Sequence, residues 1–173
     1  MAGKMSKKTW LIIVAILIIA VGAIVGIALS RSSPSPSDFT LPIITWNETT
    51  LSELEGTPVV LNFWSISCYW CRQQLPYLEN VAQQSEGELK VIAINIRDSA
   101  SGIQTFFGDY EPTMIIALDK NREAFADYCL AYNNTRGAIP FTLFVDSEGL
   151  VQYVKIGAFT SEEELQNTLD SLF

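Results

Sequence analysis

Val59–Glu79 reads VVLNFWSISCYWCRQQLPYLE and joins a strand pattern to a helix pattern through two cysteines. Residues 59–64 are apolar apart from Asn62, which is typical of a central strand buried on both faces. From Cys71 onward, apolar residues recur at the spacing of a helix. The pair Cys68 and Cys71 therefore lies where a buried strand passes into a helix.

The position of this cysteine pair favours redox chemistry. At a helix start, the sulfur of Cys68 lies near free backbone N–H groups and the positive end of the helix dipole, which stabilise a thiolate. Cys71 lies one turn further on, within reach of a disulfide and less exposed. We expect Cys68 to be the nucleophile and Cys71 the resolving thiol, with exchange through a mixed disulfide on Cys68.

Two other uses of the cysteines are less favoured. A zinc site needs four ligands, whereas the chain has this one pair, a lone Cys129 and no histidine. A permanent structural disulfide between Cys68 and Cys71 would close a very small loop and gain little entropic stabilisation. Cys129 lies in a helix pattern and is expected to be a buried, inert thiol. We expect neither a metal nor a cofactor.

Strand and helix patterns alternate along the rest of the chain and predict an α/β layout with a mixed sheet. A turn is predicted at Asp146–Gly149. Strands are predicted at 39–45 (or a hairpin arm), 59–64, 91–96, 114–118, 141–145 and 150–156, and helices at 51–55, 71–84, 103–107, 123–132 and 162–172.

An apolar run precedes this domain. Residues 10–29, WLIIVAILIIAVGAIVGIAL, carry no charge, and a helix of that length spans about 30 Å, the thickness of the hydrocarbon core. Three lysines precede the run and only Arg31 closely follows it, so the positive-inside rule places the domain outside the cytoplasm, in the periplasm or at the cell surface. A cleaved signal peptide is the alternative. The predicted parts are a cytoplasmic N-terminus (1–9), a single transmembrane signal anchor (10–29), a Ser/Pro linker (30–37) and the folded domain (38–173).

Composition excludes several classes of protein. The chain has 11 Lys and Arg against 19 Asp and Glu, a net charge of -8. All nineteen acids lie after Arg31, but only seven of the positive residues do. The chain after Arg31 therefore has a net charge of -12, which argues against a nucleic-acid partner. The lack of histidine excludes His-dependent triads and haem attachment through Cys-x-x-Cys-His.

A second motif lies about seventy residues after the cysteines. Gly137–Pro140 directly precedes a predicted strand, where an X-Pro bond can be cis. Because proline leaves the sheet edge without a donor, the backbone of Ile139 could pair with an incoming peptide.

Together these motifs resemble the thioredoxin superfamily, and more closely the TlpA/ResA-like membrane-anchored thiol–disulfide oxidoreductases. The resemblance covers residues 38–173. It rests on six features: an N-terminal hairpin (38–42), a segment that leads into the central strand (51–58), the core motif with the cysteines (62–71), a proline that kinks the following helix (Pro76), an insertion (99–127) and a cis-proline loop (137–140).

The resemblance implies a thioredoxin fold, with a mixed central sheet flanked by helices, an N-terminal hairpin and a central insertion. It implies that Pro140 is the substrate-facing cis-proline, with Ile139 beside it, and that Trp64 and Gln74 support the site. The expected partners are protein thiols and disulfides. The expected electron donor is a membrane carrier of the CcdA/DsbD-like kind, which would make the protein a reductant.

The chain departs from the family at the residues around the cysteines. The dipeptide between them is Tyr69-Trp70, without the common proline, and we expect at least one ring to be an exposed contact for partner proteins. Gln74 stands where members that reduce apocytochrome c often have glutamate, and Asn62 where thioredoxins have a buried aspartate. Gln74 cannot relay a proton, which weakens a cytochrome role, and it is either coupled to the cysteines or a solvated helix residue.

Two further functions are the alternatives. A non-catalytic thioredoxin-like binding module would not need both Cys68 and Cys71. A peroxiredoxin-like peroxidase needs a threonine shortly before its reactive cysteine, and residues 65–67 are Ser-Ile-Ser.

Overall fold

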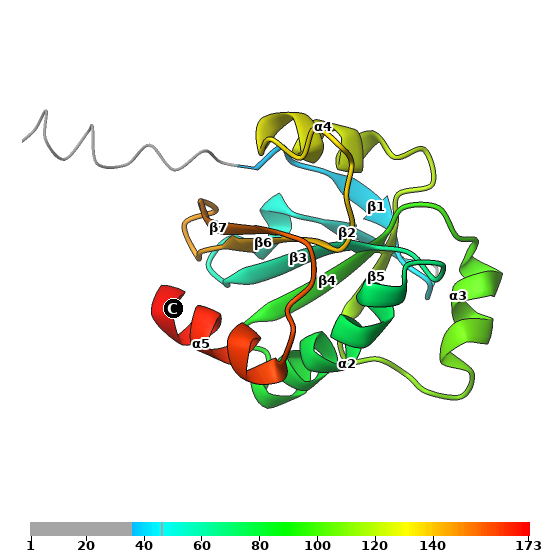
Figure 1. The fold of residues 1–173 in the computed structure, drawn as a ribbon, viewed down its shortest axis with the longest axis horizontal. Coiled ribbons are helices and arrows are strands. Elements are labelled where there is room, and N and C mark those ends of the chain that lie inside the picture. The colour runs from blue at the N-terminus through cyan, green and yellow to red at the C-terminus, as the bar shows by residue number, and fades with distance from the viewer. Residues whose placement is uncertain (1–35, 46) are drawn as a thin grey trace, which may run out of the picture. The chain divides into compact units, whose positions relative to one another are not determined.

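The computed structural model describes residues 36–45 and 47–173, and within them the main feature is a five-stranded mixed sheet (Figure 1). The strand order is β5-β4-β3-β6-β7, with β3, β4 and β5 parallel and β6 and β7 antiparallel. The strands are β3 (Val59–Trp64), β4 (Lys90–Asn95), β5 (Ile115–Leu118), β6 (Phe141–Val145) and β7 (Val151–Ile156). The α/β layout and the mixed sheet predicted from the sequence are confirmed.

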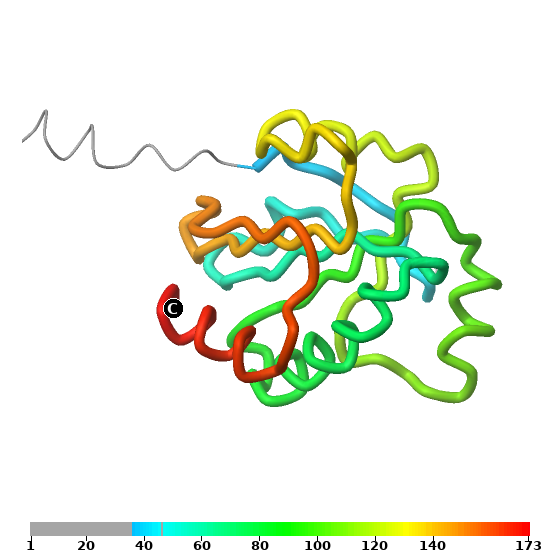
Figure 2. Tube along the Cα trace, viewed as in Figure 1, coloured from blue at the N-terminus to red at the C-terminus, as the bar shows by residue number. Residues whose placement is uncertain are grey.

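Helices cover both faces of this sheet. Figure 2 traces α2 (Tyr69–Gln84) and α5 (Glu162–Leu172) together on one side, and α4 (Glu123–Ala131) on the other. The antiparallel hairpin of β1 (Thr40–Pro42) and β2 (Glu48–Thr50) packs on the α4 side, and η1 (Ser52–Leu54) leads into β3. A further helix, α3 (Ala100–Phe107), packs with α2 and follows β4.

The alternation of side chains along β3 forms the two halves of the core. Val60 and Trp64 face the cluster that includes α2 and α5, whereas Leu61 and Phe63 face the cluster that includes α4. All four are fully buried. Burial of each such side chain contributes about 1.5–3 kcal/mol, which explains why this strand lies at the centre of the sheet.

The strands and helices predicted within residues 38–173 are all present, with ends that differ by a few residues. The stretch 99–127 holds α3, β5 and the first half of α4. Strand β2 was missed, because its three residues are polar and lack an apolar alternation. The predicted membrane segment 10–29 lies outside the described residues, and within 36–45 and 47–173 no helix is long and apolar enough to cross a bilayer.

A buried carboxylate joins α2 to the loop before β5. Glu79 Oε1 accepts hydrogen bonds from Thr113 N (2.8 Å) and Tyr110 Oη (2.9 Å), and Glu79 Oε2 accepts one from Met114 N (3.2 Å). Burial by itself would raise the pKa of Glu79, but these hydrogen bonds outweigh it and the pKa is lowered. The carboxylate form therefore stabilises the fold.

We predict that Glu79→Gln lowers the free energy of unfolding at pH 7 by about 1–3 kcal/mol, because an amide NH₂ would face backbone N–H donors. A lowered folded-state pKa means that the contribution of Glu79 is present above the unfolded value of about 4.3 and is lost as the pH falls below it. The difference between wild type and variant should therefore shrink in acid. Urea unfolding at several pH values measures this. Glu163→Gln, on the exposed side of α5, is the control, and a loss that is independent of pH would contradict the prediction.

Candidate active site

The two cysteines of the motif form a disulfide at the start of α2. Cys68 is the N-cap residue, with extended backbone, and its Sγ accepts a hydrogen bond from Cys71 N at 3.1 Å. Cys68 is half-buried, whereas Cys71 is 1% exposed. A partner can therefore reach Cys68 but not Cys71, as the sequence predicted. The same backbone N–H groups that cap α2 would stabilise a thiolate on Cys68 after reduction.

A polar pair fixes the loop between β3 and Cys68. Asp98 Oδ2 accepts hydrogen bonds from Ile66 N (2.7 Å) and from Asn95 Nδ2 (2.9 Å). Asn95 Oδ1 accepts in turn from Asp98 N at 2.7 Å. Sequence reasoning missed both residues, although polar side chains at the end of a buried parallel strand were the available signal.

The cis-proline loop lies against the disulfide, 71 residues away in sequence. The Ile139–Pro140 bond is cis, as expected from the sequence, and Ile139 O lies 3.7 Å from Cys68 Sγ. Asn134 holds the loop, since its side chain donates to Ala138 O (2.8 Å) and accepts from Ala138 N (2.9 Å). Asn134 is a supporting residue that sequence reasoning did not identify.

Tyr69 and Trp70 are both exposed, at 56% and 61%. Their ring centroids lie 5.1 Å apart in an edge-to-face arrangement. The expectation that at least one ring faces solvent is confirmed. Since large aromatic side chains gain by burial, the pair offers an apolar contact next to the disulfide.

Trp64 has a different place from the other predicted site residues. Its side chain is fully buried and packs against Phe106 and Phe107 of α3, with ring centroids 5.7 and 6.2 Å away. Its Nε1 has no hydrogen-bond partner in the described part of the chain. Trp64 therefore belongs to the apolar wall between β3 and α3 and is shielded from a partner.

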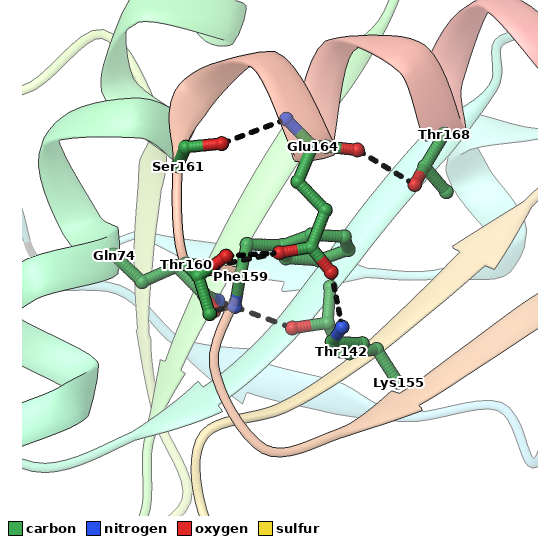
Figure 3. Close-up of polar contacts among 8 residues, drawn as sticks. All are labelled: Gln74, Thr142, Lys155, Phe159, Thr160, Ser161, Glu164 and Thr168. Carbon is green, nitrogen blue, oxygen red and sulfur yellow. Dashed lines mark hydrogen bonds and ion pairs between the residues drawn. The ribbon is translucent and has the colours of Figure 1, made fainter.

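Gln74 is fully buried, so its interpretation as a solvated helix residue is wrong. Figure 3 shows its side chain reaching from α2 toward the backbone of Phe159: Gln74 Oε1 accepts from Phe159 N at 2.8 Å, and Gln74 Nε2 donates to Thr142 Oγ1 at 3.2 Å. Asn62 Nδ2 donates to the same hydroxyl at 2.9 Å. Amide and hydroxyl groups thus fill a polar cluster beneath the cysteine helix where the family often places acids.

Cys129 lies on α4, which packs with the core half opposite to α2, and it is a free thiol. It is half-buried rather than buried. Burial raises the pKa of its thiol, with a smaller opposing effect from Arg122, so Cys129 is a poor nucleophile.

Comparison with known proteins agrees with this geometry. Residues 34–154 match the model of the AhpC/TSA family. The chain is 30% identical to the thioredoxin-like protein YneN of Bacillus subtilis over 149 residues, which cover 84% of this chain and 81% of YneN. It is 27% identical to the thiol-disulfide oxidoreductase ResA of the same organism, over 77% of this chain and 71% of ResA.

A solved structure is similar in fold. The crystal structure of a putative thiol:disulfide interchange protein DsbE from Chlorobium tepidum superposes with a TM-score of 0.70 at 22% identity, covering 81% of this chain and 96% of that protein. At this identity the likeness concerns the thioredoxin-like fold alone. Taken with the matches in sequence and with the Cys68–Cys71 pair, it leads to one conclusion: the chain belongs to the AhpC/TSA family, within the TlpA/ResA-like group of the thioredoxin superfamily.

Proposed function

We propose that this protein is a thiol–disulfide oxidoreductase that reduces disulfides in other proteins outside the cytoplasm. The observation that carries the proposal is the Cys68–Cys71 disulfide at the start of α2, with the outer sulfur 3.7 Å from the carbonyl of Ile139. A nucleophilic sulfur at a helix N-terminus can attack a disulfide in a segment that is bound beside it.

The reaction transfers two electrons from the reduced pair to the substrate. The Cys68 thiolate attacks one sulfur of the substrate disulfide, forming a mixed disulfide and releasing the other substrate sulfur as a thiolate that takes up a proton. Cys71 then loses its proton and attacks Cys68 Sγ. The Cys68–Cys71 disulfide forms, and the second substrate sulfur leaves as a thiolate.

The proposed location rests on the apolar run 10–29 and the lysines before it. An anchor there and a Ser/Pro linker at 30–37 would keep the domain near the membrane. A membrane electron carrier of the CcdA/DsbD-like kind is the proposed donor that returns the pair to its reduced state. The resemblance to the TlpA/ResA-like oxidoreductases implies a reductant, which supports the same direction here.

We predict that Cys71→Ser accumulates a mixed disulfide with a substrate protein, because the resolving thiol is gone while Cys68 can still attack. Reduced full-length chain is incubated with insulin, and non-reducing electrophoresis with mass spectrometry identifies the linked cysteines. Cys68→Ser should trap almost nothing. Cys129→Ser is the matched control and should turn over insulin like the wild type.

Three outcomes would contradict this assignment. If Cys68→Ser is the variant that traps insulin, the roles of the two cysteines are reversed. If the wild type reduces no disulfide but consumes hydrogen peroxide, the peroxidase alternative is correct. If it does neither, the domain is a binding module.

Gln74 cannot accept the proton that leaves Cys71. It lies three residues after Cys71 on the same side of α2, and its side chain cannot titrate. Its partners Thr142 and the Phe159 backbone N–H do not titrate in the physiological range either. The pair should therefore work without a carboxylate-coupled proton step from this position.

We predict that Gln74→Glu raises the pKa of the Cys68 thiol by about one unit or more, since a buried negative charge nearby disfavours a thiolate. The rate of iodoacetamide alkylation as a function of pH measures this in the reduced full chain. Gln73→Glu is the control, because it adds the same charge one position away on the exposed side of α2. Alkylation curves that coincide for wild type and both variants would show that position 74 is not coupled to the cysteines.

A further inference from the structure

Charged residues are separated between the two ends of the sheet. Eight acids precede the parallel strands or form the β6–β7 turn, at the end away from the disulfide: Glu53, Glu55, Glu86, Glu88, Asp109, Glu111, Asp146 and Glu148. Five of the seven Lys and Arg after Arg31 lie at the opposite end, where they follow the parallel strands, begin α2 or precede β6: Arg72, Arg97, Lys120, Arg122 and Arg136. The end that carries the disulfide is therefore the basic end of an acidic domain.

Three of these arginines lie on segments that contain or contact the residues around the disulfide, and all three are exposed. Arg72 lies in the first turn of α2, where its backbone N donates to Cys68 O at 3.2 Å. Arg97 follows β4 in the loop that binds the segment before Cys68. Arg136 lies three residues before Ile139, whose carbonyl contacts Cys68 Sγ. Exposed positive residues therefore lie on three chain segments that meet near Cys68.

No ion pair among residues 36–45 and 47–173 neutralises these three charges. The ion pair found among the described residues joins Lys155 to Glu164 and involves none of the three arginines. The acids that follow β4 and β5, Asp98 and Asp119, are turned toward the backbone, since each accepts an N–H hydrogen bond at 2.7 Å. The N-terminal end of the α2 dipole adds to the positive potential.

A groove continues from the cis-proline loop onto α4. The groove has a volume of about 750 Å³, and its lining includes Gly137, two residues before Ile139. Arg122 and Arg136 line it, together with Leu130, which is 85% exposed, and none of the described lining residues is acidic. The groove thus offers cationic and apolar contacts side by side.

We propose that the preferred substrate is a protein whose disulfide lies in an acidic segment with apolar residues beside it. Carboxylates of that segment pair with Arg72, Arg97 and Arg136, because guanidinium groups bind carboxylates with two parallel hydrogen bonds. Apolar side chains next to the disulfide contact Tyr69 and Trp70. The charge on the rim also speeds encounter with an acidic segment. This inference rests on the proposed function, since it names the substrate class of the same site.

The test compares two synthetic peptides that contain the same disulfide-closed loop and differ in flanks of glutamate or lysine. Initial rates of reduction by the reduced full chain give kcat/KM for each peptide. The glutamate peptide should be preferred, and the preference should shrink at high salt, because salt screens exposed charges. Each of Arg72→Gln, Arg97→Gln and Arg136→Gln should lower the preference about two- to fivefold.

Lys90→Gln is the matched control, since it removes one positive charge at the other end of the sheet and should leave the preference unchanged. For each variant, the ratio of kcat/KM for the two peptides cancels any change in the pKa of Cys68. Comparing this ratio between a variant and the wild type also cancels the difference in the peptides' own reactivity. Equal rates for both peptides in the wild type, or an equal loss of preference in Lys90→Gln, would overturn the inference. Failure to reduce either peptide would instead contradict the proposed function.

Discussion

The antiparallel pairing of β3 with β6 is the constraint on which the site depends. Its register places Phe63 opposite Phe141 and Asn62 opposite Thr142. The first pair brings Pro140 to the end of β3, within reach of the loop that leads to Cys68. The second pair starts the polar cluster beneath α2, because Asn62 and Gln74 both donate to the Thr142 hydroxyl. A slip of one residue would turn Thr142 to the other face of the sheet and remove both features.

The polar cluster is neutral, and this limits which groups can shift the pKa values of the cysteine thiols. A buried acid beneath a thiol pair exchanges protons with it and also opposes its ionisation. Here Asn62, Thr142 and Gln74 satisfy one another and the Phe159 backbone without a charge. Stabilisation of the Cys68 thiolate then rests on the N-terminal end of α2.

Sequence patterns were sufficient for the strands and helices and for the position of the two cysteines, because those features are local, whereas the thioredoxin fold was expected from the resemblance to its family. Buried strands such as Val59–Trp64 show as apolar runs, and Cys68 and Cys71 lie at a recognisable junction of strand and helix. The place of Gln74 was not predictable in this way, since its burial depends on Thr142 and Phe159, 68 and 85 residues away. Asp98 was missed for the same reason: its partner Ile66 comes from a different strand–loop junction.

The disulfide and the groove lie on different elements and share one connection, the loop from Asn134 to Pro140. Cys68 and Cys71 belong to α2, whereas Arg122 and Leu130 belong to α4 or its N-cap, which packs with the other half of the core. Asn134, which also lines the groove, holds the shared loop through two hydrogen bonds to Ala138 and so links the groove to the segment that carries Ile139. Substitution of Arg122 or Leu130 would therefore change the charge or the apolar surface of the groove while leaving the cysteines and the first turn of α2 in place.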